Sequence, residues 1–491
     1  MNVKLSKLVI AALASTSMMG FGGLAHADST NDIVNALVMK GVLTEEEGAL
    51  LTKGHAGEIG AAKKEKDSTV HSAGKMAIRG YLQVRNTALL GGENSNKGIN
   101  LWSDRSVGNV YSMADKDKNF IIRRARVIIS GSAGDRLDYY IQPDFASSAS
   151  TTNNVAQLRD YYGDFNLTKD KVHRVRVGQS KVPYGFENLQ SSQNRLALDR
   201  ADAFNSAVRD ERDLGAFYYY TPDNIQKLMK EIQDSGLKHT GNYGMFALGA
   251  YNGQGANQQD QNSNYHVVAR ASYPWKTESG QIYEAGIQGY KGKYVRSASA
   301  YSRIANQTST ATAPSVNASG SADGFKDERV GISFMMYPMP FGLQGEWNWG
   351  KTPGLETDAG SVIGGTGNAS TFKRGEIQQK NLSGGYIQTM YKIDHVKIGD
   401  TDGTVIPFVR WQYFDGYSKA EANSPLNKVN DWELGAEWQI APEVELVAYY
   451  HHMNRSNLVT GSTSTTTNPS RNADYERFKA DALRVQLQYN F

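Results

Sequence analysis

The sequence predicts an all-β fold, a transmembrane antiparallel β-barrel of sixteen strands. From Lys75 to the end of the chain, apolar and polar residues alternate with the period of two that β-strands have. Long polar segments alternate with short turns between the predicted strands. The mean hydropathy is low although the 27 tyrosines are many. A barrel explains both, because half of each strand faces water in the lumen and aromatic residues gather at the two membrane interfaces.

The last predicted strand shows the alternation most clearly. Its apolar and polar residues follow one another as Leu483, Arg484, Val485, Gln486 and Leu487. One face of this strand would lie in lipid and the other in water. A soluble β-sandwich also alternates, so this pattern alone does not separate the two folds.

The connection lengths favour the barrel. Sixteen strand centres lie near residues 81, 126, 141, 162, 176, 216, 247, 270, 287, 333, 347, 387, 410, 434, 449 and 486. The long polar connections include residues 88–118, 180–211, 291–327, 351–381 and 455–479. Outer-membrane barrels alternate long external loops with short periplasmic turns in this way. The connection 221–242 is long where a short turn is expected, so either it holds a small helix or the strand count is locally wrong.

Barrel closure and strand number together predict a pore. A sheet in lipid has to close, because hydrocarbon offers an open edge no hydrogen-bond partner. Sixteen strands leave an aqueous lumen, whereas about eight would be filled by side chains.

The start of the chain resembles an export signal. Lys4 and Lys7 precede an apolar stretch that ends in a small-x-small cleavage pattern at Ala27. We therefore expect residues 1–27 to be a signal peptide and the mature chain to start at Asp28.

Residues 28–74 are expected to form a short helical periplasmic segment and a linker ahead of the barrel, which takes residues 75–491. A capping box at Thr44 and Glu47 supports a helix start. The segment is either a periplasmic spacer or a self-associating helix that helps to assemble an oligomer.

Composition excludes several classes of function. Without the two lysines of residues 1–27, 51 basic residues stand against 50 acidic ones, so the mature chain lacks the basic surplus of a nucleic-acid-binding protein. The absence of cysteine fits export. No cofactor or metal site is indicated, and no nucleophile elbow or spaced ligand set points to an enzyme.

Residues 119–220 carry a series of linked motifs. They are Asn119–Gly131, Gln142–Phe145, Leu158–Tyr161, Arg176–Glu187 and Asp213–Gly215. In order and spacing they resemble the N-terminal half of the phosphate-selective porin O and P family. Beyond residue 220 the resemblance is mainly architectural and ends with the terminal Phe491.

The resemblance implies a homotrimer of 16-stranded barrels in the bacterial outer membrane. It implies that the third external loop folds inward to constrict each pore and that arginines line a path for phosphate. It also implies that the final alternating strand, which ends in Phe491, is similar to the signal read by the barrel-insertion machinery. The expected partners are small anions, outer-membrane lipid and lipopolysaccharide, with no nucleic acid.

The distribution of arginines indicates the same part of the chain as the family motifs. Residues 120–215 hold 11 of the 24 arginines and only three lysines. A planar guanidinium matches two oxygens of an oxyanion and keeps its charge. Strand alternation places four arginines on the lumen face, and the third loop with its far end supplies five further cations. The nine candidates for the anion path are Arg124, Arg126, Arg174, Arg176, Lys181, Arg195, Arg200, Arg209 and Arg212.

Alternation does not settle in which direction three other arginines point. Arg123 falls on the lipid-side parity, so it either snorkels to the interface or marks a β-bulge. Arg85 and Arg159 lie in family-like motifs without a settled direction.

Two other pores remain possible. Residues 120–215 also hold twelve acidic residues, which could pair with the arginines and hold the loop against the wall. Four glutamates have lumen parity: Glu346, Glu433, Glu437 and Glu445. A general porin with a mixed-charge lumen is therefore an alternative. A carbohydrate porin, with an aromatic track that could include Tyr139, Tyr161 and Tyr162, is another. A structural barrel whose pore is closed is a further alternative.

Overall fold

The structure is a computed structural model that describes most of the predicted barrel. The described residues are 76–92, 101, 118–149, 152–296, 323–356, 376–421, 424–462 and 471–491. The predicted signal peptide, residues 1–27, and the predicted helical segment and linker, residues 28–74, lie outside them.

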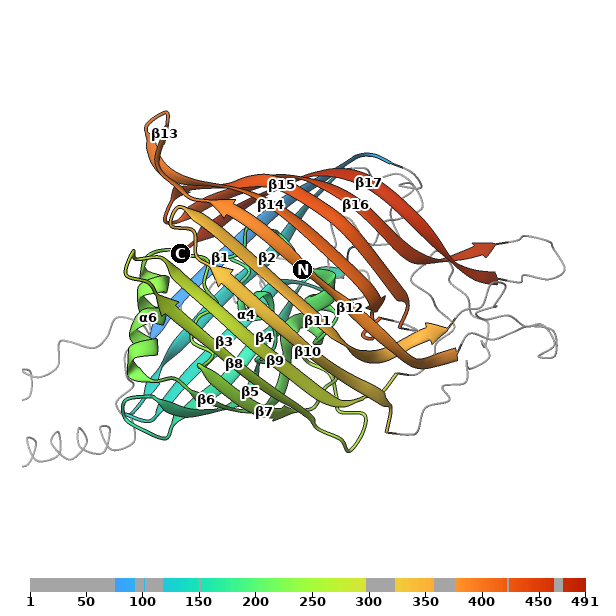
Figure 1. The fold of residues 1–491 in the computed structure, drawn as a ribbon, viewed down its shortest axis with the longest axis horizontal. Helices are drawn as coiled ribbons and strands as arrows, with labels where there is room; N and C mark the ends of the chain where they lie inside the picture. The colour runs from blue at the N-terminus through green and yellow to red at the C-terminus, as the bar shows by residue number, and fades with distance from the viewer. Residues whose placement is uncertain are drawn as a thin grey trace, which may run out of the picture. The chain divides into compact units, whose positions relative to one another are not determined.

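The described chain forms one antiparallel sheet that closes on itself (Figure 1). Sixteen strands follow one another around the ring, and β1 pairs with β17 to close it. The terminal residue takes part, since the Gly80 N–H donates to the Phe491 carbonyl at 2.6 Å and the Phe491 N–H donates back at 3.0 Å. The predicted fold class and strand number are confirmed.

Each of the sixteen predicted strand centres falls within a strand of the ring. The ring strands are β1 (Ala77–Gly91), β2 (Lys118–Ala133), β3 (Leu137–Ala149), β4 (Thr152–Asn166), β5 (His173–Lys181), β6 (Arg212–Tyr220), β7 (Phe246–Tyr251), β8 (His266–Lys276), β9 (Ile282–Tyr294), β10 (Phe325–Met336), β11 (Phe341–Glu356), β12 (Glu376–Tyr391), β14 (Thr401–Tyr417), β15 (Leu426–Ala441), β16 (Val444–Ser462) and β17 (Arg471–Asn490).

A seventeenth strand, β13 (Ile393–Ile398), was not predicted. It pairs with the start of β14, while β12 pairs directly with the middle of β14. β13 therefore forms a hairpin that projects beyond the ring (Figure 1).

Several strands run further than the sequence pattern indicates. The predicted loop 455–479 is wrong in its bounds, because β16 continues to Ser462 and β17 begins at Arg471. Beyond the lipid both faces of a strand meet water, so the alternation of side chains disappears while the backbone pairing continues.

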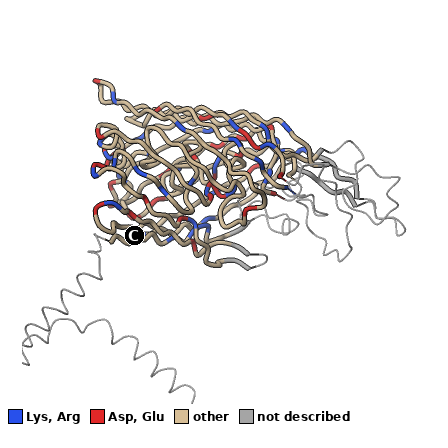
Figure 2. The backbone as a smooth tube through the Cα atoms, turned by 90° about the horizontal axis from the view of Figure 1, so that it is seen from below, with Lys and Arg blue, Asp and Glu red and all other residues tan. Residues whose placement is uncertain are grey.

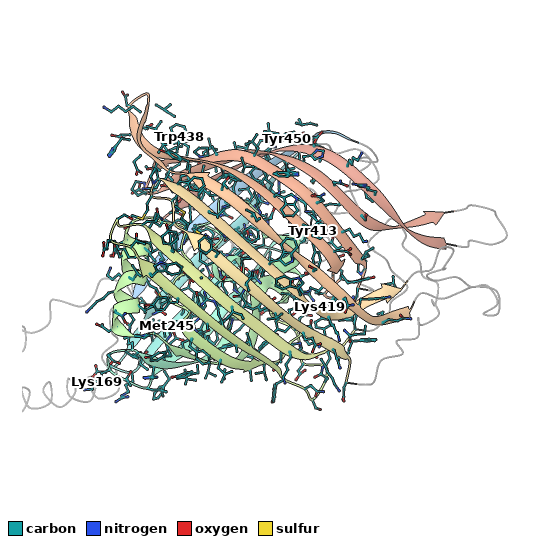
Figure 3. All side chains as sticks on the ribbon, in the orientation of Figure 1. Lys169, Met245, Tyr413, Lys419, Trp438 and Tyr450 are labelled. Atoms are coloured by element: carbon teal, nitrogen blue, oxygen red, sulfur yellow. The ribbon has the colours of Figure 1, made fainter. Side chains whose placement is uncertain are left out.

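The burial pattern is inverted relative to a soluble protein. The largest fully buried side chains include Arg85, Arg212 and Arg410, whereas Ile287 and Leu434 are 57% and 59% exposed. Charged side chains point into the barrel and apolar ones point out. Figure 3 shows the resulting outward fringe of side chains around the ring.

Replacing Leu434 with arginine tests the assignment of the outer face. Leu434 lies near the middle of β15 and points outward. A cation at the bilayer midplane should lower the free energy of unfolding by about 2–4 kcal/mol, measured by denaturant titration in lipid vesicles. Lys428, an exposed cation nearer the end of the same strand, gives the matched control K428R. Equal stability of L434R and the wild type would contradict a lipid-facing position.

The two ends of the barrel differ in their connections. The end that carries the turns after β2, β4, β8, β10 and β15 is called the short-turn end, and the opposite end is the long-loop end. Lys169 marks the turn after β4 at the short-turn end, and Lys419 marks the β14–β15 loop toward the long-loop end (Figure 3).

The long connection between β6 and β7 holds a helix, α6 (Asp223–Asp234). The first of the two predicted explanations for residues 221–242 is therefore confirmed, and the strand count is unaffected. Figure 1 places α6 at the short-turn end, together with the C-terminus. Among the described helices, none is long and apolar enough to cross a membrane.

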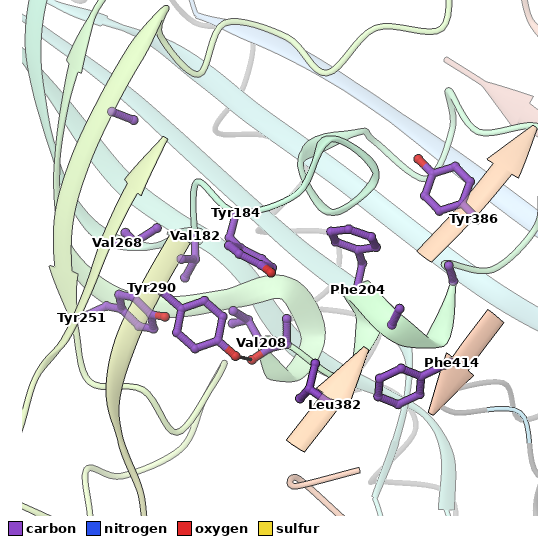
Figure 4. Packing of buried hydrophobic residues seen from close by; sticks show 14 of the residues in the cluster. Val182, Tyr184, Phe204, Val208, Tyr251, Val268, Tyr290, Leu382, Tyr386 and Phe414 are labelled. Atoms are coloured by element: carbon purple, nitrogen blue, oxygen red, sulfur yellow. Dashed lines mark hydrogen bonds between the residues drawn. The ribbon is translucent and has the colours of Figure 1, made fainter. Parts of the chain in front are cut away.

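The loop between β5 and β6, residues 182–211, is called L3 and lies inside the barrel. It contains α4 (Phe186–Leu189), α5 (Asp202–Asn205) and the 3-10 turn η2 (Arg209–Glu211). Its apolar side chains pack against aromatic side chains that point inward from the barrel wall (Figure 4). Tyr184 contacts Tyr290 edge-on at 4.9 Å between ring centroids, and Phe204 contacts Tyr386 at 6.2 Å.

Candidate functional site

L3 is fastened to the wall on the side of β11 and β14. The N–H groups of Phe186 and Glu187 donate to the Glu346 carboxylate at 2.5 and 2.7 Å. The Glu187 carboxylate in turn receives two hydrogen bonds from Arg410, at 2.6 and 3.1 Å. Both members of this ion pair are 1% exposed. The first arm of L3 therefore reaches across the lumen to the opposite wall.

A second anchor joins L3 to β15 and β16. The Arg455 guanidinium donates to Asp202 of α5 at 3.0 Å and to Asp431 of β15 at 2.5 Å. His451 contacts the same Asp431 carboxylate at 3.1 Å, and Asn427 donates to Asp202 at 2.8 Å. This polar group fixes the returning arm of L3.

A third anchor centres on Asp199 and faces β1, β2 and β17. Its carboxylate pairs with Arg85 at 3.0 Å, Arg484 at 2.8 Å and Arg123 at 3.7 Å. Arg123 reaches the lumen because the β1–β2 register skips one residue between Gln83 and the next pair, Val84 and Ile122. Of the two explanations offered for Arg123, the β-bulge is confirmed. Arg85 also faces the lumen.

The surrounding charges hold the Asp199 carboxyl in its ionised form. Burial alone would raise its pKa, but Arg85, Arg123, Arg124 and Arg195 together bring the pKa below its usual value. The pKa of Glu211, at the end of L3, is lowered in the same way against the effect of burial, chiefly by Arg200 and Arg212. L3 is thus held by ionised carboxylates.

These lowered pKa values predict how acid affects L3. A carboxyl whose pKa is lower in the docked state stabilises docking above its usual pKa, about 4, and loses this contribution as the pH falls through the lowered value. We expect the single-channel conductance to be constant from pH 8 to about pH 4 and to become larger or noisier below it. The Asp199→Asn variant should show the larger or noisier conductance at every pH. A transition of the wild type near neutral pH would contradict this origin.

Five of the nine predicted path residues form ion pairs with carboxylates. Arg126 pairs with Asp144 at 2.8 Å, Arg174 and Arg176 pair with Asp164 at 3.5 and 2.7 Å, Arg200 pairs with Glu211 at 2.6 Å, and Arg212 pairs with Asp160 at 2.8 Å. Lys181 instead donates to the carbonyl oxygens of Leu189 and Gln190 at 2.9 and 2.8 Å. Much of the predicted positive charge therefore has a local counter-charge.

Arg124 and Arg195, like Lys181, have no carboxylate partner among the described residues. Arg124 donates one hydrogen bond, to Gln83 at 2.8 Å, and its Nε has no partner. Arg195 is 4% exposed, yet none of its three guanidinium nitrogens has a hydrogen-bond partner in the described part of the chain. Its charge also lies within electrostatic range of Arg124.

Four of the nine predicted residues share one cavity of about 280 Å³, which we call the basic cavity. They are Arg126, Arg176, Lys181 and Arg212. Tyr162 forms part of the wall and lies face-on to Arg176, with the guanidinium carbon 3.7 Å from the ring centre. Strands β2, β5 and β6 thus bring four predicted residues together.

Arg209 and two of the three tyrosines predicted for an aromatic track do not line the basic cavity. Arg209 lies beside Gly255 of the β7–β8 loop, away from the basic cavity. Of the proposed aromatic track, Tyr161 points outward and is 57% exposed, so that part of the alternative is wrong. Tyr139 has the same outward parity as the exposed Leu137, and Tyr162 alone of the three lines the basic cavity.

The sequence pattern missed the residues that receive L3. Arg410 and Arg455 come from strands far along the chain, and only their lumen parity could have indicated them. Acidic side chains reach the same interior: Glu433 and Glu437 are 3% and 0% exposed. Figure 2 shows basic and acidic positions intermixed along the barrel.

The comparisons with known proteins agree with this architecture. A family model of the phosphate-selective porin O and P family matches residues 96–491. No curated protein sequence matches the chain.

The chain is also similar to three solved structures. The outer membrane channel DcaP of Acinetobacter baumannii is 13% identical, with 86% of this chain and 98% of that chain covered and a TM-score of 0.46. The trimer form of OmpT of Vibrio cholerae is 11% identical, with 86% and 100% covered and a TM-score of 0.42. The anion-selective porin from Comamonas acidovorans is 10% identical, with 85% and 99% covered and a TM-score of 0.42.

The closed sixteen-stranded ring, the loop folded into its lumen and the family match over most of the chain lead to one assignment. The chain belongs to the phosphate-selective porin O and P family and is a porin of the bacterial outer membrane.

Proposed function

We propose that this porin lets small anions, phosphate among them, diffuse through a pore that L3 narrows. The observation that carries the proposal is Arg195. It sits within L3 as a buried cation whose guanidinium has no hydrogen-bond partner among the described residues. A buried donor without an acceptor costs about 1–3 kcal/mol, and a charged one costs more. Water or a passing anion can supply the acceptors.

The charge of Arg195 persists at neutral pH. Burial, followed by the neighbouring Arg200, lowers the pKa of Arg195 to about 9, and the carboxylates Glu187, Glu211 and Asp199 oppose the change. Each of these carboxylates is engaged by another arginine. Arg195 therefore remains a cation whose hydrogen-bond donors have no acceptor among the described residues, and one nitrogen of Arg124 is in the same condition.

The five paired path residues support a different pore, in which basic and acidic groups on the walls admit small solutes of either sign. In that general porin the arginines only hold L3 in place. The two models differ at Arg195 and Arg124, because an unpaired guanidinium matters to selectivity and not to anchoring.

The test is phosphate titration of the chloride current in a planar bilayer. If phosphate binds Arg195 through a charge-assisted hydrogen bond, Arg195→Gln should weaken the phosphate block by about tenfold. Arg124→Gln should weaken it in the same direction. Arg136, an exposed residue of the β2–β3 turn that donates to the Leu167 carbonyl, gives the control R136Q. No phosphate block of the wild type, or an equal block in R195Q, would favour the general porin.

We also propose that the porin is a homotrimer, as its family membership suggests. Chemical crosslinking of the purified protein in detergent should yield a limiting species of three chains. A limiting species of one or two chains would contradict the assembly without affecting the pore model.

A further inference from the structure

The connection between β6 and β7 enters the lumen after α6. Residues 235–245 follow the helix and precede β7. Gly236, Gly241 and Gly244 have positive φ angles of 64°, 90° and 79°, which glycine adopts without strain. These positions let the chain change direction within a short distance.

Lys238 shows how far this segment reaches. Its Nζ forms an ion pair with Glu437 of β15, and the two side chains are 5% and 0% exposed. Around the ring, β15 lies seven strands beyond β7 in one direction and eight beyond β6 in the other. Glu437 is therefore on the wall opposite the segment's own strands. Residues 235–245 cross the lumen.

The crossing segment also contacts L3. The Gln190 side chain donates to the Lys238 carbonyl at 3.0 Å, and the Asn194 amide contacts His239 Nε2 at 3.2 Å. On its return, the Asn242 carbonyl accepts a hydrogen bond from Arg174 at 2.5 Å. L3 and the crossing segment thus form two connected layers inside the barrel.

The two layers separate two cavities on the short-turn side. One is the basic cavity of about 280 Å³, and the other, of about 660 Å³, lies against β13, β14, β15 and β16. Four residues line both cavities: Gln193, Asn194, Gln233 and His239. Gln193 and Asn194 belong to L3, Gln233 to α6 and His239 to the crossing segment, so all three parts lie between the two spaces.

The two cavities differ in charge. The larger one has Lys238 and Lys392 on its walls together with Asp394, Asp402 and Glu445, so we call it the mixed cavity. Burial, followed by the charges of Lys238 and Arg79, lowers the pKa of His239 to about 4, so the partition itself is neutral there at neutral pH. Solute in the basic cavity meets four arginines, one lysine and one carboxylate, whereas solute in the mixed cavity meets two lysines and three carboxylates.

We propose that residues 235–245 are a latched partition and that Lys238 is a positioning residue for selectivity. By pairing with Glu437, Lys238 holds the segment across the lumen and neutralises a buried carboxylate of β15, which also accepts a hydrogen bond from Gln439 on the wall of the mixed cavity. Transit is thereby directed through the basic cavity. The statement about selectivity rests on the proposed anion function, whereas the latch itself does not.

Conductance and selectivity of Lys238→Ala, measured in planar bilayers on the full protein, test the latch. Because the mixed cavity is more than twice the size of the basic one, joining them should raise the single-channel conductance by about twofold. Anion preference should fall, since Glu437 then lacks its counter-charge. Glu437→Gln should raise the conductance similarly but keep the anion preference. The charge swap K238E/E437K should restore the wild-type values.

Lys230→Ala is the matched control, because Lys230 lies on α6 in an exposed ion pair with Asp234. It should conduct as the wild type does. Unchanged conductance in both K238A and E437Q would overturn the latch, even if the wild type is anion-selective. If K238A and E437Q raise the conductance while the wild-type channel shows no anion preference, the latch is supported and the proposed anion function is rejected. If K238A does not insert, E437Q and the swap still decide between these outcomes.

Discussion

Replacing Arg410 with alanine should raise the single-channel conductance by about twofold or more, because sixteen strands enclose a wide aqueous lumen wherever L3 does not fill it. Arg410 is the buried partner of Glu187 in the first arm of L3. Removing one member of such a pair leaves a buried carboxylate and costs about 3–5 kcal/mol. The Glu187 carboxylate also accepts the Ala201 N–H at 2.9 Å, so both arms of L3 are affected.

The double variant E187Q/R410M is the control for this experiment. It removes both charges together, and such replacements of a buried pair are often neutral for stability. Its conductance should stay near that of the wild type. This ion pair would not anchor L3 if R410A conducted as the wild type does, or if the double variant conducted as R410A does.

Replacing Arg455 with methionine should produce a large loss of stability. The Arg455 guanidinium bridges Asp202 of L3 and Asp431 of β15, and it is fully buried. Its loss leaves two carboxylates without their cation inside the barrel. The free energy of unfolding should fall by about 3–5 kcal/mol, measured by denaturant titration in lipid vesicles.

A neighbouring arginine provides the comparison. Arg477 of β17 is exposed and donates to Asn454 at 2.6 Å. Surface substitutions of this kind usually change stability by less than about 0.5 kcal/mol, so R477M should unfold with the wild type. Equal unfolding of R455M and R477M would remove the second anchor from the account.

The strands could be predicted because lipid imposes the same two-faced pattern on each of them. Leu483 and Leu487 point outward and Arg484 and Gln486 point inward, as the alternation indicated. The pattern failed where lipid does not act. It ended β16 too early, and it missed β13, whose residues are mostly exposed on both faces.

The candidate site was less predictable, because a charge on the lumen face does not reveal its partner. Alternation correctly turned Arg124, Arg126, Arg174 and Arg176 inward, but three of these four pair with carboxylates. The pairing depends on the path of L3 across the lumen, which brings residues more than two hundred positions apart together, as with Glu187 and Arg410. No local pattern carries that information.

The crossing segment shows the same limit. The length of the β6–β7 connection indicated that something unusual lies there, and Lys238 was visible as one of its lysines. Its partner Glu437 was visible as a lumen-parity glutamate of β15. Only the closed ring, with β15 opposite β6 and β7, joins the two observations.

The reversal potential of the wild-type channel in a tenfold potassium chloride gradient measures directly whether the pore prefers anions. Fixed, unpaired guanidinium groups in the L3 layer should displace the reversal potential from zero toward the chloride equilibrium potential, about 59 mV in magnitude. R195Q should reduce that displacement. A reversal potential at zero, or displaced toward the potassium equilibrium potential, would contradict an anion-conducting pore.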